Sequence, residues 1–313
     1  MTVFCSNKMS IQEDGPLEPS IDLGEPTEDL IEWAKEHINE DPDKRDQVIS
    51  DFRDLIFFNA RVLEENVLHI GPMTNSYCGS LRARHFIVKL AHRLIVNYYN
   101  FKESNPQYFK DVRIERLREL TKHEIISVPP YKDQLGRRTL IIRIAEVEVD
   151  EIFQVLIVTI ELAAMEPSVQ IKGGVVIFDL SDLSVSQAWY MTPTIANHII
   201  QIAVKCFPVR LEKIHILHQS WVFDIGYNFV KPLMNDNIKE RIAFHGDDLE
   251  SLHSYIDPKH LPERYGGIHK DYPADIWFEC IRKHDNVIEH LIELGYEDAE
   301  TLKGQLHAEN SNL

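Results

Sequence analysis

The sequence predicts an α/β protein: a mostly parallel sheet with crossover helices, preceded by an all-helical N-terminal domain. Up to about residue 125, apolar residues recur at the spacing of amphipathic helices. After the paired prolines Pro129 and Pro130, which exclude helix, short apolar runs alternate with longer helical segments. Runs that are apolar throughout are typical of strands covered on both faces, so we expect parallel strands joined by right-handed crossovers.

The N-terminal part is expected to form a helical domain over residues 28–125. It follows residues 1–27, an acidic, proline-containing segment that we expect to be a disordered tail. Apolar stripes over residues 30–38 and 48–56 predict the first two helices. A longer stripe over residues 86–99 predicts a third helix, so this half is interpreted as a bundle.

The second domain is expected over residues 126–268. Its strands are predicted where β-branched apolar runs occur, at residues 138–145, 173–179, 213–217 and 241–244. The helices between them are predicted at residues 149–165, 192–206 and 221–234. Beyond this domain, residues 269–313 are expected to hold a C-terminal helix over residues 275–294, followed by a polar tail.

Charge and cysteine usage narrow the possible functions. The formal net charge of −17 argues against a nucleic-acid binder, because a phosphate backbone requires a basic surface. The four cysteines lie far apart, without the spacing of a zinc site or a disulfide framework, and free thiols suit a cytoplasmic location. The longest apolar stretch, residues 153–165, is interrupted by Glu161 and is too short to span a bilayer.

The sequence contains no recognisable catalytic motif. It lacks a phosphate-binding glycine loop, a Gly-x-Ser-x-Gly segment and a His-Glu-x-x-His segment. His284 and His290 lie on the same expected helix but are six residues apart, so they do not share a face. We therefore expect no catalytic residue, no metal site and no cofactor, and we interpret the protein as not an enzyme.

Residues 221–241 begin with a mostly apolar segment and end in a charged turn, Asn235–Arg241. Their spacing predicts a helix that is apolar on more than half of its circumference and ends near Pro232. Such a helix requires apolar surroundings on both sides. It is either a crossover helix buried in the domain, or a helix with the core on one side and a ligand or a membrane on the other.

Four short segments follow one another in a recognisable order: Leu81-Arg82-Ala83-Arg84-His85-Phe86, Pro106-Gln107-Tyr108-Phe109, Arg241-Ile242-Ala243-Phe244-His245-Gly246 and Leu261-Pro262-Glu263-Arg264-Tyr265-Gly266-Gly267. Over about residues 28–267 the chain resembles the CRAL-TRIO lipid-binding family. In that family the first segment opens a helix, which implies that the third helix begins at Leu81. One departure is Tyr77-Cys78-Gly79-Ser80, where the family has a larger apolar run and another arginine.

The resemblance implies a lipid cavity that is closed by a mobile gate helix. In the family, the counterpart of residues 221–241 covers the cavity and opens at a membrane. Carried over to this chain, the gate consists of Trp221, Val222, Phe223, Ile225, Phe229, Val230 and Leu233.

The resemblance also implies which residues line the cavity. Carried over position by position, they are Phe153, Leu156, Ile160, Phe178, Met191, Ile199, Ile202, Ala203, Phe207, Leu211 and Ile214. Members that bind a hydroxylated ligand have serines where this chain has Leu156 and Ile160. A buried ligand hydroxyl without a partner costs about 1–3 kcal/mol, which favours a retinoid, an isoprenoid or a similar ligand over tocopherol.

A phosphoinositide contact is implied by basic residues beside the gate. The family positions that remain basic here are Arg84, Arg210 and Arg241, and Lys213 and Lys239 lie close to them in the sequence. Two further family positions are lost, because Glu212 and Asn237 occupy them. Solvated surface charge is the alternative interpretation of these residues.

The function implied by the resemblance is the binding of a hydrophobic ligand and its transfer between membranes. The protein is then expected to be cytoplasmic and transiently at membranes, with possible phosphoinositide contact and no nucleic-acid partner. The first alternative is a phosphoinositide-binding adaptor in vesicle or endosomal traffic that transfers no cargo. The second is a lipid-handling enzyme, or a retinoid chaperone that serves one. The sequence names no protein partner.

Overall fold

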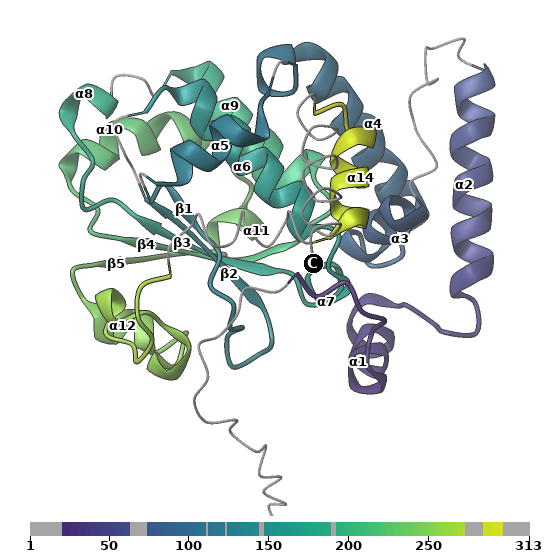
Figure 1. Cartoon of the computed structure of the whole chain (residues 1–313), viewed down its shortest axis with the longest axis horizontal. Coiled ribbons are helices and arrows are strands. Elements are labelled where there is room, and N and C mark those ends of the chain that lie inside the picture. The colour runs from purple at the N-terminus through teal and green to yellow at the C-terminus, as the bar shows by residue number, and fades with distance from the viewer. Residues whose placement is uncertain are drawn as a thin grey trace, which may run out of the picture.

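A computed structural model describes residues 21–62, 74–110, 112–122, 124–143, 147–188, 192–272 and 284–296. Figure 1 shows a sheet with helices on both sides and the N-terminal helices grouped at one end of it. Within the described residues, the mostly parallel α/β fold that the sequence predicts is confirmed. The domain boundaries drawn from the sequence remain a prediction.

The N-terminal helices are α1 (Glu28–Ile38), α2 (Arg45–Val62), α3 (Thr74–Ala83), α4 (Val88–Ser104) and α5 (Ile114–Thr121), with a 3₁₀ turn at Pro106–Tyr108. The expected stripes lie on α1, α2 and α4, and Asn39 ends α1 in the left-handed conformation. Before α1, Ile21 is buried against α5 and α14, within the segment predicted to be a disordered tail.

The expectation that Leu81–Phe86 opens the third helix is wrong. The segment ends α3 instead, because His85 and Phe86 take positive φ angles of 53° and 55°. The amide of Phe86 donates to the Leu81 carbonyl at 2.7 Å and that of His85 to the Arg82 carbonyl at 3.2 Å, the pattern of a Schellman motif. The next helix, α4, begins only at Val88.

The sheet consists of β1 (Ile126–Ser127), β2 (Arg138–Arg143), β3 (Gly174–Asp179), β4 (Leu211–Leu217) and β5 (Ile242–Gly246), adjacent in that order. Only β1 is antiparallel to its neighbour. Because successive parallel strands lie side by side, right-handed crossovers place all connecting helices on one face. In Figure 1, α6, α9 and α10 lie on one side of the sheet and α12 on the other.

The connecting helices are α6 (Val149–Ala163), α7 (Pro167–Lys172), α8 (Val185–Ala188), α9 (Pro193–Ile200), α10 (Trp221–Val230) and α11 (Asp236–Lys239). A π-helical turn, Gln201–Cys206, continues α9, and a 3₁₀ turn, Lys231–Leu233, follows α10. After β5 come α12 (Leu249–His253), 3₁₀ turns at Pro258–His260 and Glu263–Tyr265, and α14 (Asp285–Glu293). The helix α14 buries Val287, Ile288 and Leu291 in the core cluster that contains α5 and α6.

The buried guanidinium of Arg82 joins the N-terminal helices to the sheet domain. Arg82 in α3 donates from Nε and Nη2 to both carboxylate oxygens of Glu40, at 2.8 and 2.7 Å. Its Nη1 donates to Gln170 Oε1 in α7 at 2.7 Å. At Gly79 a Cβ would lie only 3.3 Å from the Gln170 amide nitrogen, so glycine allows α3 to approach α7 closely. This approach gives a physical reason for the small residues at 78–80.

Replacement of Arg82 by Met is expected to destabilise the protein strongly. The change leaves the Glu40 carboxylate buried, with only Arg45 within 3.2 Å. Breaking a buried pair costs about 3–5 kcal/mol, and the remaining Arg45 contact favours the lower value. Urea unfolding measures the loss. The control is Lys44→Met, because Lys44 forms an exposed pair with Asp41 that is worth less than about 1 kcal/mol. Equal losses in both variants would mean that the buried pair adds nothing beyond an exposed one.

A buried histidine pair links β4, β5 and α12. The Nδ1 atom of His215 lies 2.9 Å from Nε2 of His245, whose Nδ1 lies 2.8 Å from the Ser251 hydroxyl. His215 is completely inaccessible. Burial, followed by the positive field of His245 and Lys213, lowers the pKa of His215 to about 3. The folded protein therefore keeps this imidazole neutral at pH values where an unfolded chain protonates it.

The stability of the protein is consequently expected to depend on pH through His215. Its contribution is complete above pH 6.5, the ordinary histidine pKa, and is lost as the pH falls toward 3. The slope from this residue reaches at most about 1.4 kcal/mol per pH unit. Urea unfolding from pH 7 to pH 4.5 should give a flatter profile for His215→Gln than for the wild type. His37→Gln, at an exposed position, should reproduce the wild-type slope; an unchanged slope in His215→Gln would refute the assignment.

Candidate functional site

The two faces of the sheet are packed differently. On the α12 side, Val175 and Ile177 of β3 are fully buried together with Leu252. Because side chains alternate along a strand, Val176 and Phe178 point to the other face, toward the crossover helices. Both are only half-buried, although β3 is a central strand. Accessible surface at the middle of a helix-covered face indicates space between the sheet and the helices.

An apolar cluster lies on this side and contains many of the residues that the sequence selected. From α6 it includes Phe153, Leu156 and Ile160, and from α9 and the turn that follows it includes Ile199, Ile202 and Phe207. Phe178, Ala203, Leu211 and Ile214 are half-buried and lie outside this cluster. Met191 lies outside the described residues. The identity of the cavity lining therefore stays a prediction.

The N-terminal part contributes aromatic residues to this cluster that the sequence did not predict. Phe101, Tyr108 and Phe109 pack against Phe153, and the Tyr108 hydroxyl lies 2.9 Å from Nδ1 of His198 on α9. Rings of Phe101, Tyr108 and Phe153 surround this imidazole, and burial lowers its pKa. His198 follows Ile195 by three residues on the apolar stripe, which was the available signal.

The helix α10 has the expected apolar character and ends before Pro232, as the sequence predicts. Its inner face is buried at Val222 and Val230, and Val230 packs with Ala196 and Ile200 of α9. Phe223 and Ile225 are half-buried. Apolar side chains also point outward, since the exposed fractions are 65% for Trp221, 42% for Phe229 and 43% for Leu233. Its role as a gate stays a prediction.

The basic residues selected beside the gate have unequal surroundings. Arg210 is 6% exposed, and Nε, Nη1 and Nη2 donate to Glu212 Oε1, the Arg82 carbonyl and the Ile171 carbonyl. Its guanidinium is thus committed to internal contacts. Lys213 donates to the Glu240 carbonyl at 3.0 Å and lies over the ring of Tyr255, and Lys239 pairs with Asp236 at 3.1 Å.

Arg84 and Arg241 are two residues of this set whose positive charges repel each other near the protein surface. Arg84 is half-buried and donates to the Val204 carbonyl at 2.8 Å, whereas Arg241 is exposed and donates to the Leu211 carbonyl at 2.7 Å. Burial lowers the pKa of Arg84, and the charges of Arg241 and Arg210 lower it further. An anionic group between Arg84 and Arg241 would relieve this repulsion.

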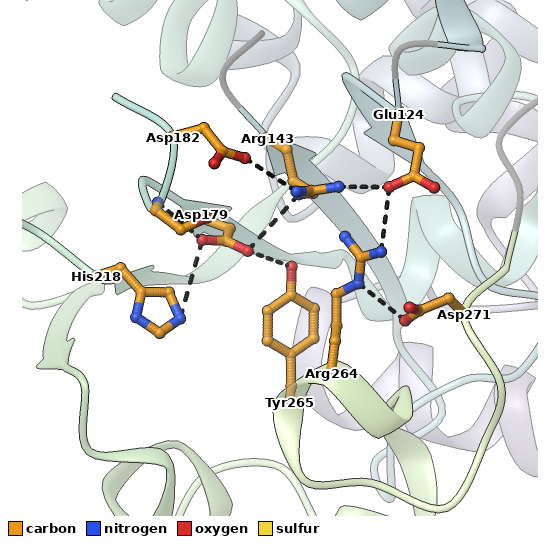
Figure 2. Close-up of polar contacts among 9 residues, drawn as sticks. Glu124, Arg143, Asp179, Asp182, His218, Arg264, Tyr265 and Asp271 are labelled. Carbon is orange, nitrogen blue, oxygen red and sulfur yellow. Dashed lines mark hydrogen bonds and ion pairs between the residues drawn. The ribbon is translucent and has the colours of Figure 1, made fainter. Parts of the chain in front are cut away.

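A polar network lies at the carboxyl ends of β2 and β3 (Figure 2). Asp179 at the end of β3 accepts a hydrogen bond from the Tyr265 hydroxyl at 2.9 Å, and Nε of Arg143 lies 3.8 Å from it. Arg143 and Arg264 both pair with Glu124, and Arg264 also pairs with Asp271 at 2.9 Å. Asp182 pairs with Arg143 as well, at 3.0 Å, so two arginines hold four carboxylates, and these contacts fasten residues 263–271 to the sheet. The sequence did not predict this network.

His218 borders this network. Its Nδ1 lies 2.8 Å from Asp247 Oδ1, and its Nε2 lies 4.0 Å from Asp179 Oδ1. Within the described residues, no three His, Cys, Asp or Glu side chains come together in an arrangement able to hold a metal ion. Over the same residues, no helix combines the length and the apolar character that crossing a membrane requires.

Comparisons with known proteins show what this chain is similar to. The model of the CRAL/TRIO domain family matches residues 122–267. Clavesin-1 of Rattus norvegicus is 28% identical over 256 residues, which cover 80% of this chain and 71% of that protein. The alpha-tocopherol transfer protein-like protein of Mus musculus is 28% identical over 261 residues, covering 80% and 73%. The crystal structure of Sfh5 aligns with a TM-score of 0.43 and 14% identity, covering 79% of this chain and 98% of that chain.

Proposed function

We propose that this chain, whose residues 122–267 match the CRAL/TRIO domain family, binds a hydrophobic lipid and carries it between membranes. The observation that carries this proposal is the incomplete burial of Val176, Phe178 and Ile214. Apolar side chains in the interior of a covered sheet ordinarily pack to full density. Space lined by such side chains is suited to an apolar ligand.

The residues around this space favour a ligand with few polar groups. Leu156 and Ile160 offer no hydrogen-bonding atom, and the Tyr108 hydroxyl is already paired with His198. The name of one relative refers to tocopherol transfer, but a ligand hydroxyl next to Leu156 would lack a partner at a cost of about 1–3 kcal/mol. A retinoid or isoprenoid of about 20 carbons gains about 0.8 kcal/mol for each buried methylene-sized group, which suffices for carriage without covalent chemistry.

The proposed gate is α10, which opens at a membrane and closes in water. The contacts that hold its inner face are apolar, as at Val230 against Ala196 and Ile200, and no side chain caps its N-terminus. A bilayer interior can replace apolar contacts without leaving polar groups unpaired. Opening is then a local change with a small free-energy cost at the membrane surface. Between encounters, the protein is proposed to be cytoplasmic.

Replacement of Ile202 by Trp is expected to abolish cargo binding. Ile202 belongs to the apolar cluster and is 3% exposed, so a larger ring must take the space of the ligand. Mass spectrometry of organic extracts from protein made in eukaryotic cells should find a stoichiometric lipid in the wild type and none in Ile202→Trp. Val96→Trp, at an exposed site on α4, is the matched control and should keep the lipid. The same lipid in all three samples would overturn the pocket assignment.

Charged substitutions on α10 are expected to weaken binding to vesicles. Trp221 and Phe229 are exposed apolar side chains, and each is worth about 1.5–3 kcal/mol when it is fully buried. Flotation with neutral phosphatidylcholine vesicles should therefore show about tenfold weaker partitioning for Trp221→Asp and for Phe229→Asp. Leu135→Asp is the control, at an exposed leucine in the turn before β2. An equal loss in the control would mean that α10 is not the docking surface.

The second candidate function is a phosphoinositide-binding adaptor without cargo. The observation that favours it is the pair Arg84 and Arg241 near the surface: burial, and then the charge of Arg241, lowers the pKa of Arg84, and a bound anion would offset this repulsion. Arg210 takes no part, because its guanidinium is used internally. This function predicts that vesicle binding depends on the phosphoinositide head group and survives in Ile202→Trp. The carrier predicts instead that Ile202→Trp loses its lipid whichever head group is present.

A further inference from the structure

A separate cavity lies between α3, α4, the end of α6 and α14. It is partly open and has a volume of about 80 Å³. Its wall contains four aromatic side chains, Tyr77, Tyr98, Tyr99 and Phe207, and the carboxylate-bearing Glu161. Among the residues predicted to line the lipid cavity, only Phe207 borders this one. The proposed lipid function therefore does not account for it.

Glu161 is the unusual group in this wall, because it is a buried carboxylate. It is 5% exposed, and its two oxygens accept hydrogen bonds from the hydroxyls of Tyr98 at 2.7 Å and Tyr296 at 2.6 Å. Burial raises the pKa of Glu161. Each carboxylate oxygen can accept more than one hydrogen bond, so Glu161 retains capacity for a further donor or a cation.

No cationic side chain is paired with Glu161 among the described residues. The charge of Lys102 acts on Glu161 and favours its ionised form, but the Lys102 ammonium donates its hydrogen bond to the Leu294 carbonyl at 2.8 Å and lies 5.5 Å from the centroid of the Phe109 ring. His290 also lines the cavity, but burial lowers its pKa to about 4, so it is neutral at physiological pH. A buried carboxylate ordinarily has a compensating positive charge. The geometry leaves that role to a molecule in the cavity.

The aromatic rings suit an organic cation. Tyr98 meets Tyr99 and Phe207 edge-to-face, with ring centroids 5.3 and 5.5 Å apart. Rings at right angles present both faces and edges around the same space, and the face of an aromatic ring attracts a cation. Tyr98 and Tyr99 are only half-buried, although they lie between packed helices, because they line the cavity. We propose that this cavity binds a small methylated ammonium ion, with Glu161 as its counter-charge.

The size of the cavity limits the ligand. One water molecule needs about 10–15 Å³ of such volume, so the cavity has room for about five to eight non-hydrogen atoms. A trimethylammonium group fits this limit, whereas a whole lipid does not. The group can belong to a free amine such as choline or to the head group of a choline lipid that reaches in through the open side.

The test compares choline with its uncharged isostere, 3,3-dimethyl-1-butanol, by calorimetric titration of the full wild-type chain at constant ionic strength. The proposal expects choline to bind at least about tenfold more tightly than the isostere, because only choline carries the charge. Equal affinities would overturn the proposal and leave an apolar cavity. The absence of choline binding up to tens of millimolar would also overturn it.

Glu161→Gln tests the counter-charge directly and should lower the choline affinity by about tenfold or more. Glu250→Gln, at an exposed position on α12, should leave it unchanged. If Glu161→Gln does not fold, the comparison of choline with its isostere on the wild type still decides the matter. A second titration distinguishes a free amine from a lipid head group as the source of the ammonium ion. It uses dihexanoylphosphatidylcholine below its micelle concentration as a competitor of choline. Competition assigns the site to a lipid head group, and no competition assigns it to a free amine. Choline titration and extraction of the bound lipid are separate measurements, so failure of the lipid proposal and failure of this one are distinguishable.

Discussion

The arrangement of the two halves of this protein depends on one buried cation, the guanidinium of Arg82. It is held by Glu40 from the α1–α2 connection and by Gln170 from α7, residues that are far apart in the chain. A buried charge costs several kcal/mol when it is unpaired, so only one placement of α3 against α7 satisfies all three groups. That placement brings α4 against the Gln201–Cys206 turn and lets the Tyr98 hydroxyl reach Glu161 at the end of α6. The apolar cluster and the Glu161 cavity both follow from it.

The order of the strands explains why the two faces of the sheet differ. Sequential parallel strands place every crossover helix on one face and leave the other to the short segment after β5. That segment packs densely, and Val175, Ile177 and Leu252 are completely buried. The histidine pair and the Asp179–Tyr265 hydrogen bond also stabilise this face. Dense packing on the α12 side allows the helix side to retain space near β3 without loss of the fold.

Local patterns carried the prediction of the fold. Apolar periodicity located α1, α2, α4, α6 and the parallel strands, because these elements depend on neighbouring residues. The helix α3 was not predicted, and its final residues were taken as the start of the next helix, since His85 and Phe86 take left-handed conformations that sequence patterns assign to glycine. The candidate cavity came from family resemblance. Contacts between distant residues were not predicted on either face of the sheet: Tyr108 meets His198 on the helix side, and Tyr265 meets Asp179, 86 positions away, on the α12 side. Pairs so distant follow no spacing rule, so only the folded arrangement identifies them.

The proposed membrane encounter has to overcome a formal charge of −17. At physiological salt, exposed charges farther apart than about 8 Å are largely screened, so the surface near α10 matters more than the total. Trp221, Phe229 and Leu233 supply affinity there through apolar burial, which carries no charge penalty. Arg241 is exposed and has five N–H donors, of which one donates to the Leu211 carbonyl. In the proposed encounter, apolar contact therefore sets how strongly the protein docks, and the arginines set which head group it prefers.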